Sequence, residues 1–199
     1  MPIRTDSVLL FDLGGVLIES QMFSELKRLM NTDQSEAELI EVWLRNPVAK
    51  QFELGQCSVD EFSQSIVREF GLDLPPADFL AEFKDWPKGF YAGVDSTLSE
   101  LRNTHTVSCL SNSNEAHWTD AITDHFDFAF SSHLIGRIKP NRDAFEHVLD
   151  TIGVEAGAVH FFDDALMNVE AASSCGLNAH HTIGYDSLKR TLLELGFLS

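Results

Sequence analysis

Basic residues are scarce in this chain of 199 amino acids. Lysine and arginine together number 14, whereas aspartate and glutamate number 31, so the formal net charge is −17 at neutral pH. A surface of this sign repels phosphodiester backbones and anionic lipid headgroups, which argues against nucleic acid or a membrane as a partner. If the ligand is an anion, a local cation or backbone dipole must offset the field of the whole chain.

Cysteines and long apolar runs are also sparse. The three cysteines, Cys57, Cys109 and Cys175, lack the spacing of a metal site, and Cys109 lies in an apolar run that predicts a core position. No apolar run approaches the roughly 20 residues of a membrane-spanning helix. The first ten residues do not resemble a signal peptide. We therefore expect a cytoplasmic protein with reduced thiols.

Short apolar runs carry the signal for the fold. Four runs of about four residues, the length of a buried strand, lie at Val8–Phe11, Val107–Leu110, Phe128–Phe130 and Val159–Phe162. Such runs are typical of strands buried on both faces of a parallel sheet. Apolar residues at helical spacing occupy 144–152 and 188–195. The sequence therefore predicts an α/β fold, a doubly wound, Rossmann-like sandwich of three layers.

Residues 20–84 have no strand pattern and instead show the spacing of amphipathic helices. Apolar stripes fall at 22–30, 39–44 and 59–70, which indicates helix–helix packing. Two of these helices begin with the S-x-x-E pattern of a capping box, at Ser35/Glu38 and Ser58/Glu61. We predict a helical cap domain at 19–85, inserted after the first strand of a core domain that comprises 1–18 and 86–199.

Four short motifs follow the predicted strands, at the sheet edge where open α/β folds bind ligands. They are FDLGG ending at Gly15, LSNSN at 110–114, GRIKP at 136–140 and FFDDALMN at 161–168. Each motif alone is a weak signal, because a single Asp, Ser or Lys is common in turns, helix caps and surfaces. The order of the motifs, with a helical insertion after the first, is far more specific.

With these motifs the whole chain resembles the haloacid dehalogenase superfamily of the helical-cap type. It is most similar to the sugar-phosphate phosphatases that have FDLG at the first motif, including those acting on sugar 1-phosphates. The resemblance implies that Asp12 is the nucleophile, Ser111 the second-motif hydroxyl and Lys139 the third-motif lysine. It also implies that Asp163 and Asp164 form the acidic pair of the fourth motif.

The chemistry of these residue types agrees with a phosphatase. A carboxylate at Asp12 can attack phosphorus and form an aspartyl-phosphate, which divides one difficult step into two. Asp12 and Asp164 together suit Mg²⁺, a hard cation that prefers oxygen ligands. The resemblance adds the backbone carbonyl of Gly14 to this metal site. We assign supporting roles to Asp163 and Asn168.

The remaining site residues are assigned to the substrate, a small phosphorylated molecule, with a sugar phosphate favoured. Lys139 supplies a point charge for a phosphoryl oxygen. Ser111 and Asn112, with N–H groups at the start of a following helix, are expected to hold other oxygens, and Gly15 completes the set. The sequence leaves the oligomeric state open.

Gly14 departs from the family pattern, in which this position has a second aspartate that transfers protons. Its loss removes a general acid of a kind typically worth about 10²–10⁴-fold in rate. A phosphatase with an acidic leaving group, or with an acid recruited from the cap, remains our first interpretation, and Glu19 is a candidate acid. Residues 52–54 precede a predicted bend in the cap and could face the site, although a helix end is the simpler interpretation. His117 follows the second motif and could overhang the site, although a surface position is the simpler interpretation.

Two other interpretations remain open, and the first of them has a variant. A 2-haloacid dehalogenase needs no proton for its halide, but such enzymes need no metal and resemble S-S-N at the fourth motif. A phosphonate hydrolase is a further variant, which would need a Schiff-base lysine in the cap. A non-catalytic binding protein on the same fold is the third interpretation. The joint presence of Asp12, Lys139 and Asp164 favours an enzyme.

Overall fold

The computed structural model describes residues 7–198, so the expectation about the first residues falls mostly outside the described part. Within that part, no helix combines the length and apolar character that a membrane crossing requires. All three cysteines are free thiols, and Cys109 is buried in the core as predicted.

A parallel sheet of five strands, in the order β5-β4-β1-β6-β7, forms the centre of the molecule. Its strands are β1 (Val8–Phe11), β4 (Thr106–Ser111), β5 (Phe128–Ser131), β6 (Val159–Asp163) and β7 (Asn178–His181). In the middle of the sheet, Val8 of β1 lies opposite Thr106 on one side and Val159 on the other. Every residue of β1 is fully buried, which explains its uninterrupted apolar sequence. The four predicted strands are confirmed.

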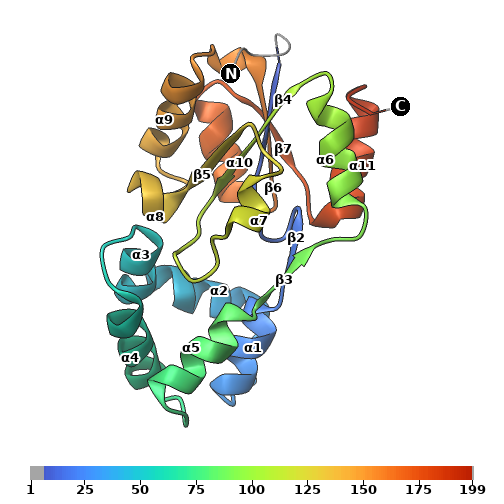
Figure 1. Ribbon diagram of the computed structural model, residues 1–199. Helices are drawn as coiled ribbons and strands as arrows, with labels where there is room; N and C mark the ends of the chain where they lie inside the picture. The colour runs from blue at the N-terminus through green and yellow to red at the C-terminus, as the bar shows by residue number, and fades with distance from the viewer. Residues whose placement is uncertain (1–6, 199) are drawn as a thin grey trace.

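Helices cover both faces of this sheet (Figure 1). They are α6 (Val94–Arg102) and α11 (Gly184–Glu194) on one face, with α9 (Arg142–Ile152) and α10 (Leu166–Ser174) on the other. Leu9 and Phe11 of β1 pack into the first cluster, whereas Val8 and Leu10 pack into the second, as strand alternation requires. The predicted three-layer α/β sandwich is confirmed.

Five helices lie between β2 (Ile18–Ser20) and β3 (Pro87–Phe90), which pair as a short antiparallel ribbon. They are α1 (Met22–Leu29), α2 (Glu36–Arg45), α3 (Pro47–Glu53), α4 (Val59–Phe70) and α5 (Pro76–Lys84). This helical unit lies beyond the carboxyl ends of the sheet strands (Figure 1). It has an apolar core of its own, in which the Phe52 and Phe62 rings stack at 4.1 Å. Both predicted capping boxes are present.

Candidate active site

Lys139 lies between two carboxylates at the carboxyl edge of the sheet. Its Nζ is 2.9 Å from Asp12 Oδ1 and 2.7 Å from Asp163 Oδ2, and its side chain is 1% exposed. Burial alone would lower the pKa of Lys139, but the charges of Asp12 and Asp163 outweigh burial and raise that pKa. Lys139 is therefore a permanent buried cation, the local positive charge that an anionic ligand needs in a chain of −17.

Three carboxylates converge beside this cation. Asp12, Asp163 and Asp164 each offer an oxygen, and these oxygens lie within 4.8 Å of one another. Burial raises the pKa of Asp12 to about 7; Lys139 opposes this rise, and the two neighbouring carboxylates add to it. Burial and the charge of Asp163 also raise the pKa of Asp164. An all-oxygen cluster with excess negative charge fits a hard divalent cation such as Mg²⁺.

The two aspartates of the fourth motif, Asp163 and Asp164, make different contacts. Asp163 Oδ1 accepts from Ala165 N at 2.8 Å and from Asn168 Nδ2 at 3.0 Å, while Oδ2 accepts from Lys139. Both oxygens of Asp163 are thus engaged in positioning Lys139 and α10. Asp164 lies at the edge of the cluster, and His181 Nε2 approaches its backbone carbonyl at 2.8 Å. Asp12 and Asp164 are therefore the better placed pair for a metal.

The two glycines of the first motif have different surroundings. A Cβ added to Gly15, whose φ is +74°, would lie 2.2 Å from Asp164 Oδ2. The Gly15 N–H donates to Ile18 O at 3.0 Å, and its carbonyl accepts from Gly184 N at 2.7 Å. Both backbone groups are engaged, so Gly15 serves the site by letting Asp164 approach. At Gly14, which is exposed, an added Cβ would have no atom within 4 Å.

The second motif supports the third. Ser111 ends β4 and is buried. The Asn112 amide accepts from Lys139 N and donates to Lys139 O, both at 2.9 Å. The side chain of Asn112 therefore holds the backbone of Lys139. The backbone N–H of Asn112 is then the group of this residue that we consider for substrate binding.

The prediction that a helix begins directly after the second motif is wrong. Residues 112–119 are irregular with a turn, and these eight residues separate the end of β4 from the next helix, α7 (Asp120–Thr123). In this loop Asn114 Oδ1 accepts from Ala116 N at 3.0 Å. Such a side-chain bond satisfies the backbone without a helix.

His117 is not the surface residue that the sequence predicts. Its ring stacks on Phe83 of α5 at 4.2 Å, and its Nε2 lies 2.7 Å from Phe83 O. Burial lowers the pKa of His117, although the bond to Phe83 opposes this. His117 thus joins the loop after β4 to the helical unit. No sequence signal reveals this contact, which spans 34 residues.

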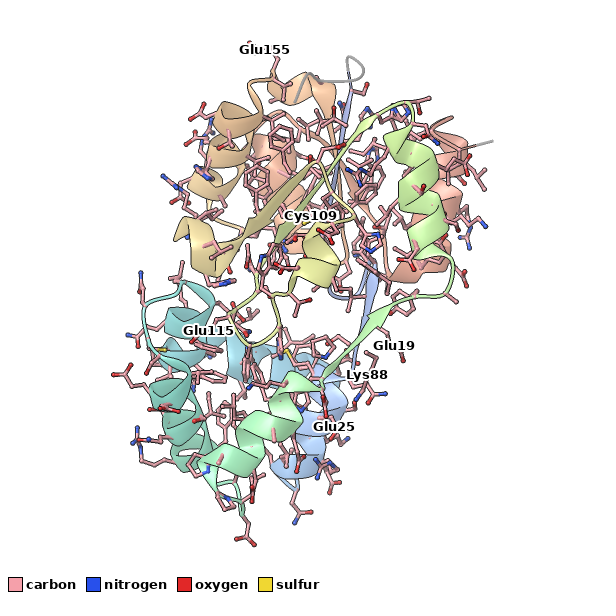
Figure 2. All side chains as sticks on the ribbon, in the orientation of Figure 1. Glu19, Glu25, Lys88, Cys109, Glu115 and Glu155 are labelled. Carbon is pink, nitrogen blue, oxygen red and sulfur yellow. The ribbon has the colours of Figure 1, made fainter. Side chains whose placement is uncertain are left out.

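Glu53 connects the helical unit with the site electrostatically. It is the last residue of α3, and Trp43 Nε1 donates to its Oε1 at 3.1 Å. Burial raises the pKa of Glu53 to about 7, against the Trp43 hydrogen bond and the positive charge of Lys139. Glu19, the candidate acid from the sequence, is instead exposed on β2, within the ribbon that β2 forms with β3 (Figure 2).

Comparisons with known proteins agree on one family. The family model of haloacid dehalogenase-like hydrolases matches residues 7–176. The sesquiterpene phosphatase AstK of Aspergillus oryzae is 29% identical over 204 residues, which cover 94% of this chain and 93% of that protein. Phosphatase MT3486 of Mycobacterium tuberculosis is 26% identical, with 87% of this chain and 86% of that protein covered.

A solved structure extends the similarity to the fold. It is a HAD family enzyme from Bacteroides thetaiotaomicron in complex with magnesium and inorganic phosphate, with a TM-score of 0.72 at 23% identity. The alignment covers 88% of this chain and 93% of that one.

Proposed function

The chain belongs to the haloacid dehalogenase-like hydrolases, and we propose that it hydrolyses a small phosphate monoester with the help of Mg²⁺. The observation that carries the proposal is the buried Lys139 beside the converging carboxylates of Asp12, Asp163 and Asp164. A dehalogenase would have no use for this oxygen cluster, because halide departs without a metal. Two relatives are named phosphatases, and the Bacteroides enzyme was solved with magnesium and phosphate.

Mg²⁺ would be held by Asp12 and Asp164, with the backbone carbonyl of Gly14 as a further ligand. Bound there, the metal would offset the repulsion between an anionic nucleophile and an anionic substrate. Asp163 and Asn168 support the site by fixing Lys139, since Asn168 Nδ2 lies 3.0 Å and 3.1 Å from the two Asp163 oxygens.

The other residues act on the phosphoryl group. The Asp12 carboxylate attacks phosphorus and the bond to the leaving oxygen breaks, which gives an aspartyl-phosphate that water then hydrolyses. Lys139 balances the charge on a phosphoryl oxygen. The Ser111 hydroxyl and the Asn112 backbone N–H donate to other phosphoryl oxygens. A sugar phosphate remains our favoured substrate.

We further propose that residues 19–85 act as a cap over a core of 1–18 and 86–199. The helical unit lies over the carboxyl edge of the sheet and touches the core at His117. Asp12 is 9% exposed and Lys139 is 3% exposed. A substrate can therefore reach them only when the cap and core separate, and closure then excludes water during the attack.

The test is phosphate release from a panel of sugar phosphates and an activated aryl phosphate. We expect release with Mg²⁺, none after chelation, and recovery when Mg²⁺ is restored. Asp12→Asn should abolish turnover, whereas Asp60→Asn, an exposed aspartate of α4, should retain it. Turnover that ignores the chelator, or that survives Asp12→Asn, would contradict the proposal. Metal-independent chloride release from 2-chloropropionate would instead support a dehalogenase.

A further inference from the structure

Because Gly14 has no side chain, the first motif supplies no proton donor for the oxygen of the leaving group. We propose that Glu53 is the general acid and base of this site, and that it reaches the leaving oxygen from the helical cap. The inference rests on the proposed phosphatase function, which it deepens by naming the group that handles protons.

The path of α3 brings Glu53 to the correct edge of the sheet. Two residues after Glu53, a Cβ added to Gly55 would lie 2.4 Å from the backbone oxygen of His133. His133 belongs to α8 (Ser132–Ile135), which starts directly after β5. Ser131, the last residue of β5, is in register with Ser111 at the end of β4. The end of α3 is therefore docked beside the second motif.

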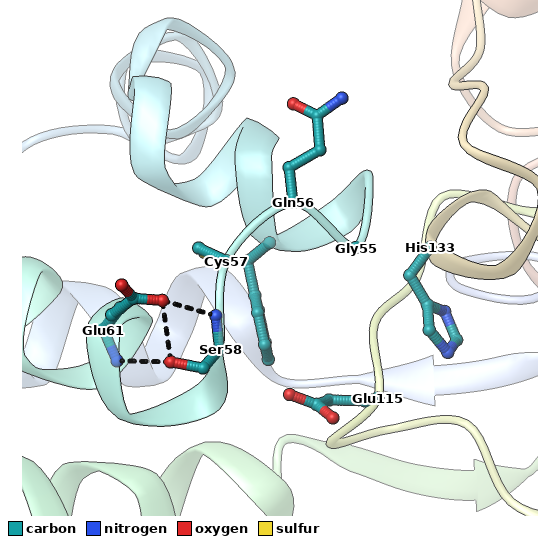
Figure 3. Close-up of a pocket in the computed structure, with 8 residues that line it drawn as sticks. Gly55, Gln56, Cys57, Ser58, Glu61, Glu115 and His133 are labelled. Carbon is teal, nitrogen blue, oxygen red and sulfur yellow. Dashed lines mark hydrogen bonds between the residues drawn. The ribbon is translucent and has the colours of Figure 1, made fainter.

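The turn that follows Glu53 faces the core across a cavity of about 510 Å³. Figure 3 shows Gly55, Gln56 and Cys57 on the cap side, with His133 and Glu115 opposite them. Because Gly55 lies in the left-handed region at φ +67° and directly against the His133 carbonyl, only glycine fits this contact. The chain is built so that this end of the cap comes close to the core.

One contact holds the Glu53 carboxyl, and a second anchors the end of α3 that carries it. The Trp43 indole donates to Glu53 Oε1 at 3.1 Å, and Trp43 itself is 5% exposed. The ring of Phe52, the preceding residue, stacks on Phe62 at 4.1 Å. A flexible surface glutamate would lack both anchors. The bond to Oε1 leaves Oε2 as the oxygen that can carry and deliver a proton.

The protonation of Glu53 matches the role. An ordinary glutamate has a pKa of about 4.3 and is almost fully ionised at neutral pH. Burial raises the pKa of Glu53 to about 7, and the Trp43 hydrogen bond and the charge of Lys139 both act in the opposite direction. A group that titrates near the working pH can both donate and accept protons.

The chemistry balances over the two half-reactions. In the first, Asp12 bonds to phosphorus, the bond from phosphorus to the leaving oxygen breaks, and protonated Glu53 gives its proton to that oxygen. In the second, ionised Glu53 takes a proton from water as the water oxygen attacks phosphorus. Asp12 is released as a carboxylate together with inorganic phosphate, and Glu53 is protonated again.

The test compares leaving groups of different acidity in the full chain with Mg²⁺. Glu53→Gln keeps the size of the side chain and a partner for Trp43. We expect it to lower kcat/KM for an alkyl phosphate by about 10²–10⁴-fold, but to leave p-nitrophenyl phosphate within about fivefold, because nitrophenolate departs without a proton. Glu41→Gln, an exposed residue of α2, is the matched control and should change neither rate.

Rescue through Gly14 sharpens the test. Since an added Cβ at Gly14 meets no atom within 4 Å, Gly14→Asp fits and should restore alkyl phosphate turnover in the Glu53→Gln background. The thermal shift induced by Mg²⁺ should be the same in Glu53→Gln and wild type, which separates proton transfer from loss of the metal site.

Three results would overturn the inference. Equal losses for both esters in Glu53→Gln would mean that Glu53 has only a structural role. A leaving-group-dependent loss in Glu19→Gln, with none in Glu53→Gln, would assign the acid to β2. Wild-type protein that releases phosphate from no ester would refute the phosphatase itself, and the inference with it.

Discussion

Gly15 is the residue at which the first loop and the fourth motif approach most closely. Gly15→Ala would bring a Cβ to 2.2 Å from Asp164 Oδ2, in a backbone conformation of φ +74°. We expect the Asp164 carboxylate to be pushed out of the cluster, with a loss of about tenfold or more in Mg²⁺ affinity. Alanine at positive φ should also cost on the order of 1 kcal/mol of stability. Calorimetric titration and denaturant unfolding measure the two effects.

Gly14→Ala is the matched control for this prediction, because its Cβ would meet nothing within 4 Å. It should bind Mg²⁺ as wild type does. Equal Mg²⁺ affinity in Gly15→Ala and Gly14→Ala would show that Asp164 does not depend on the space at Gly15.

Glu53 should make the stability of the protein depend on pH. Its pKa rises from an ordinary 4.5 to about 7 on folding, so the folded state binds more protons than the unfolded state between these values. Stability from this group is therefore highest below about pH 4.5 and falls until about pH 7. We expect Glu53→Gln to be more stable than wild type at pH 8, by on the order of 1–3 kcal/mol since Glu53 is only partly buried.

The measurement is denaturant unfolding at pH 5 and pH 8. The advantage of Glu53→Gln should be much smaller at pH 5. Gln64→Ala, at an exposed position of α4, changes no ionisable group and should differ from wild type equally at both pH values. An advantage of Glu53→Gln that is the same at both would contradict the prediction.

At the scale of elements, the capping box of α4 offers a clean measurement. Ser58 Oγ accepts from Glu61 N at 3.3 Å, and the Glu61 carboxylate accepts from Ser58 N at 2.9 Å. Ser58→Ala removes the first bond and weakens the geometry of the second, so we expect a loss of about 0.5–2 kcal/mol. Gln64→Ala, an exposed position inside the same helix, should stay within about 0.5 kcal/mol. Indistinguishable denaturation midpoints for the two variants would contradict a stabilising cap.

The elements that sequence predicts are those whose signal is local. β1 is apolar because both of its faces are buried, and Ser35 and Ser58 mark helix starts through partners three residues away. The ribbon of β2 and β3 was not predicted, because its strands are short and partly exposed and β3 contains Pro87. A local sequence pattern cannot reveal that two strands pair when their residues, Ser20 and Pro87, are 67 positions apart.

The same limit applies to the candidate site. The four motifs led to Asp12, Lys139 and Asp164, because strand ends of a parallel sheet meet at one edge. The contacts that position these residues are long-range, such as the Asn112 amide on the Lys139 backbone across 27 residues. The sequence marks Glu53 only within the stretch 52–54, which could face the site but is more simply a helix end. Its importance depends on Trp43, Lys139 and burial, which only the folded chain brings together.

At the scale of the whole molecule, excess negative charge is the dominant electrostatic feature. A net charge of −17 opposes compaction, and the cluster of Asp12, Asp163 and Asp164 concentrates that repulsion at one buried place. A divalent cation there should stabilise the fold beyond the general screening that any salt provides. At a concentration about 100 times its Kd, Mg²⁺ should add about 2.7 kcal/mol.

Thermal unfolding in chelator, in NaCl and in MgCl₂ of equal ionic strength separates the two contributions. We expect NaCl to raise the Tm of every variant by screening. We expect Mg²⁺ to raise the Tm further only in proteins that keep Asp164. Asp164→Asn should therefore keep the NaCl response and lose the Mg²⁺ increment, while Asp60→Asn, far along the chain on exposed α4 surface, should keep both. A full Mg²⁺ increment in Asp164→Asn would mean that the ion binds elsewhere, because removing one carboxylate from a shared site must weaken it.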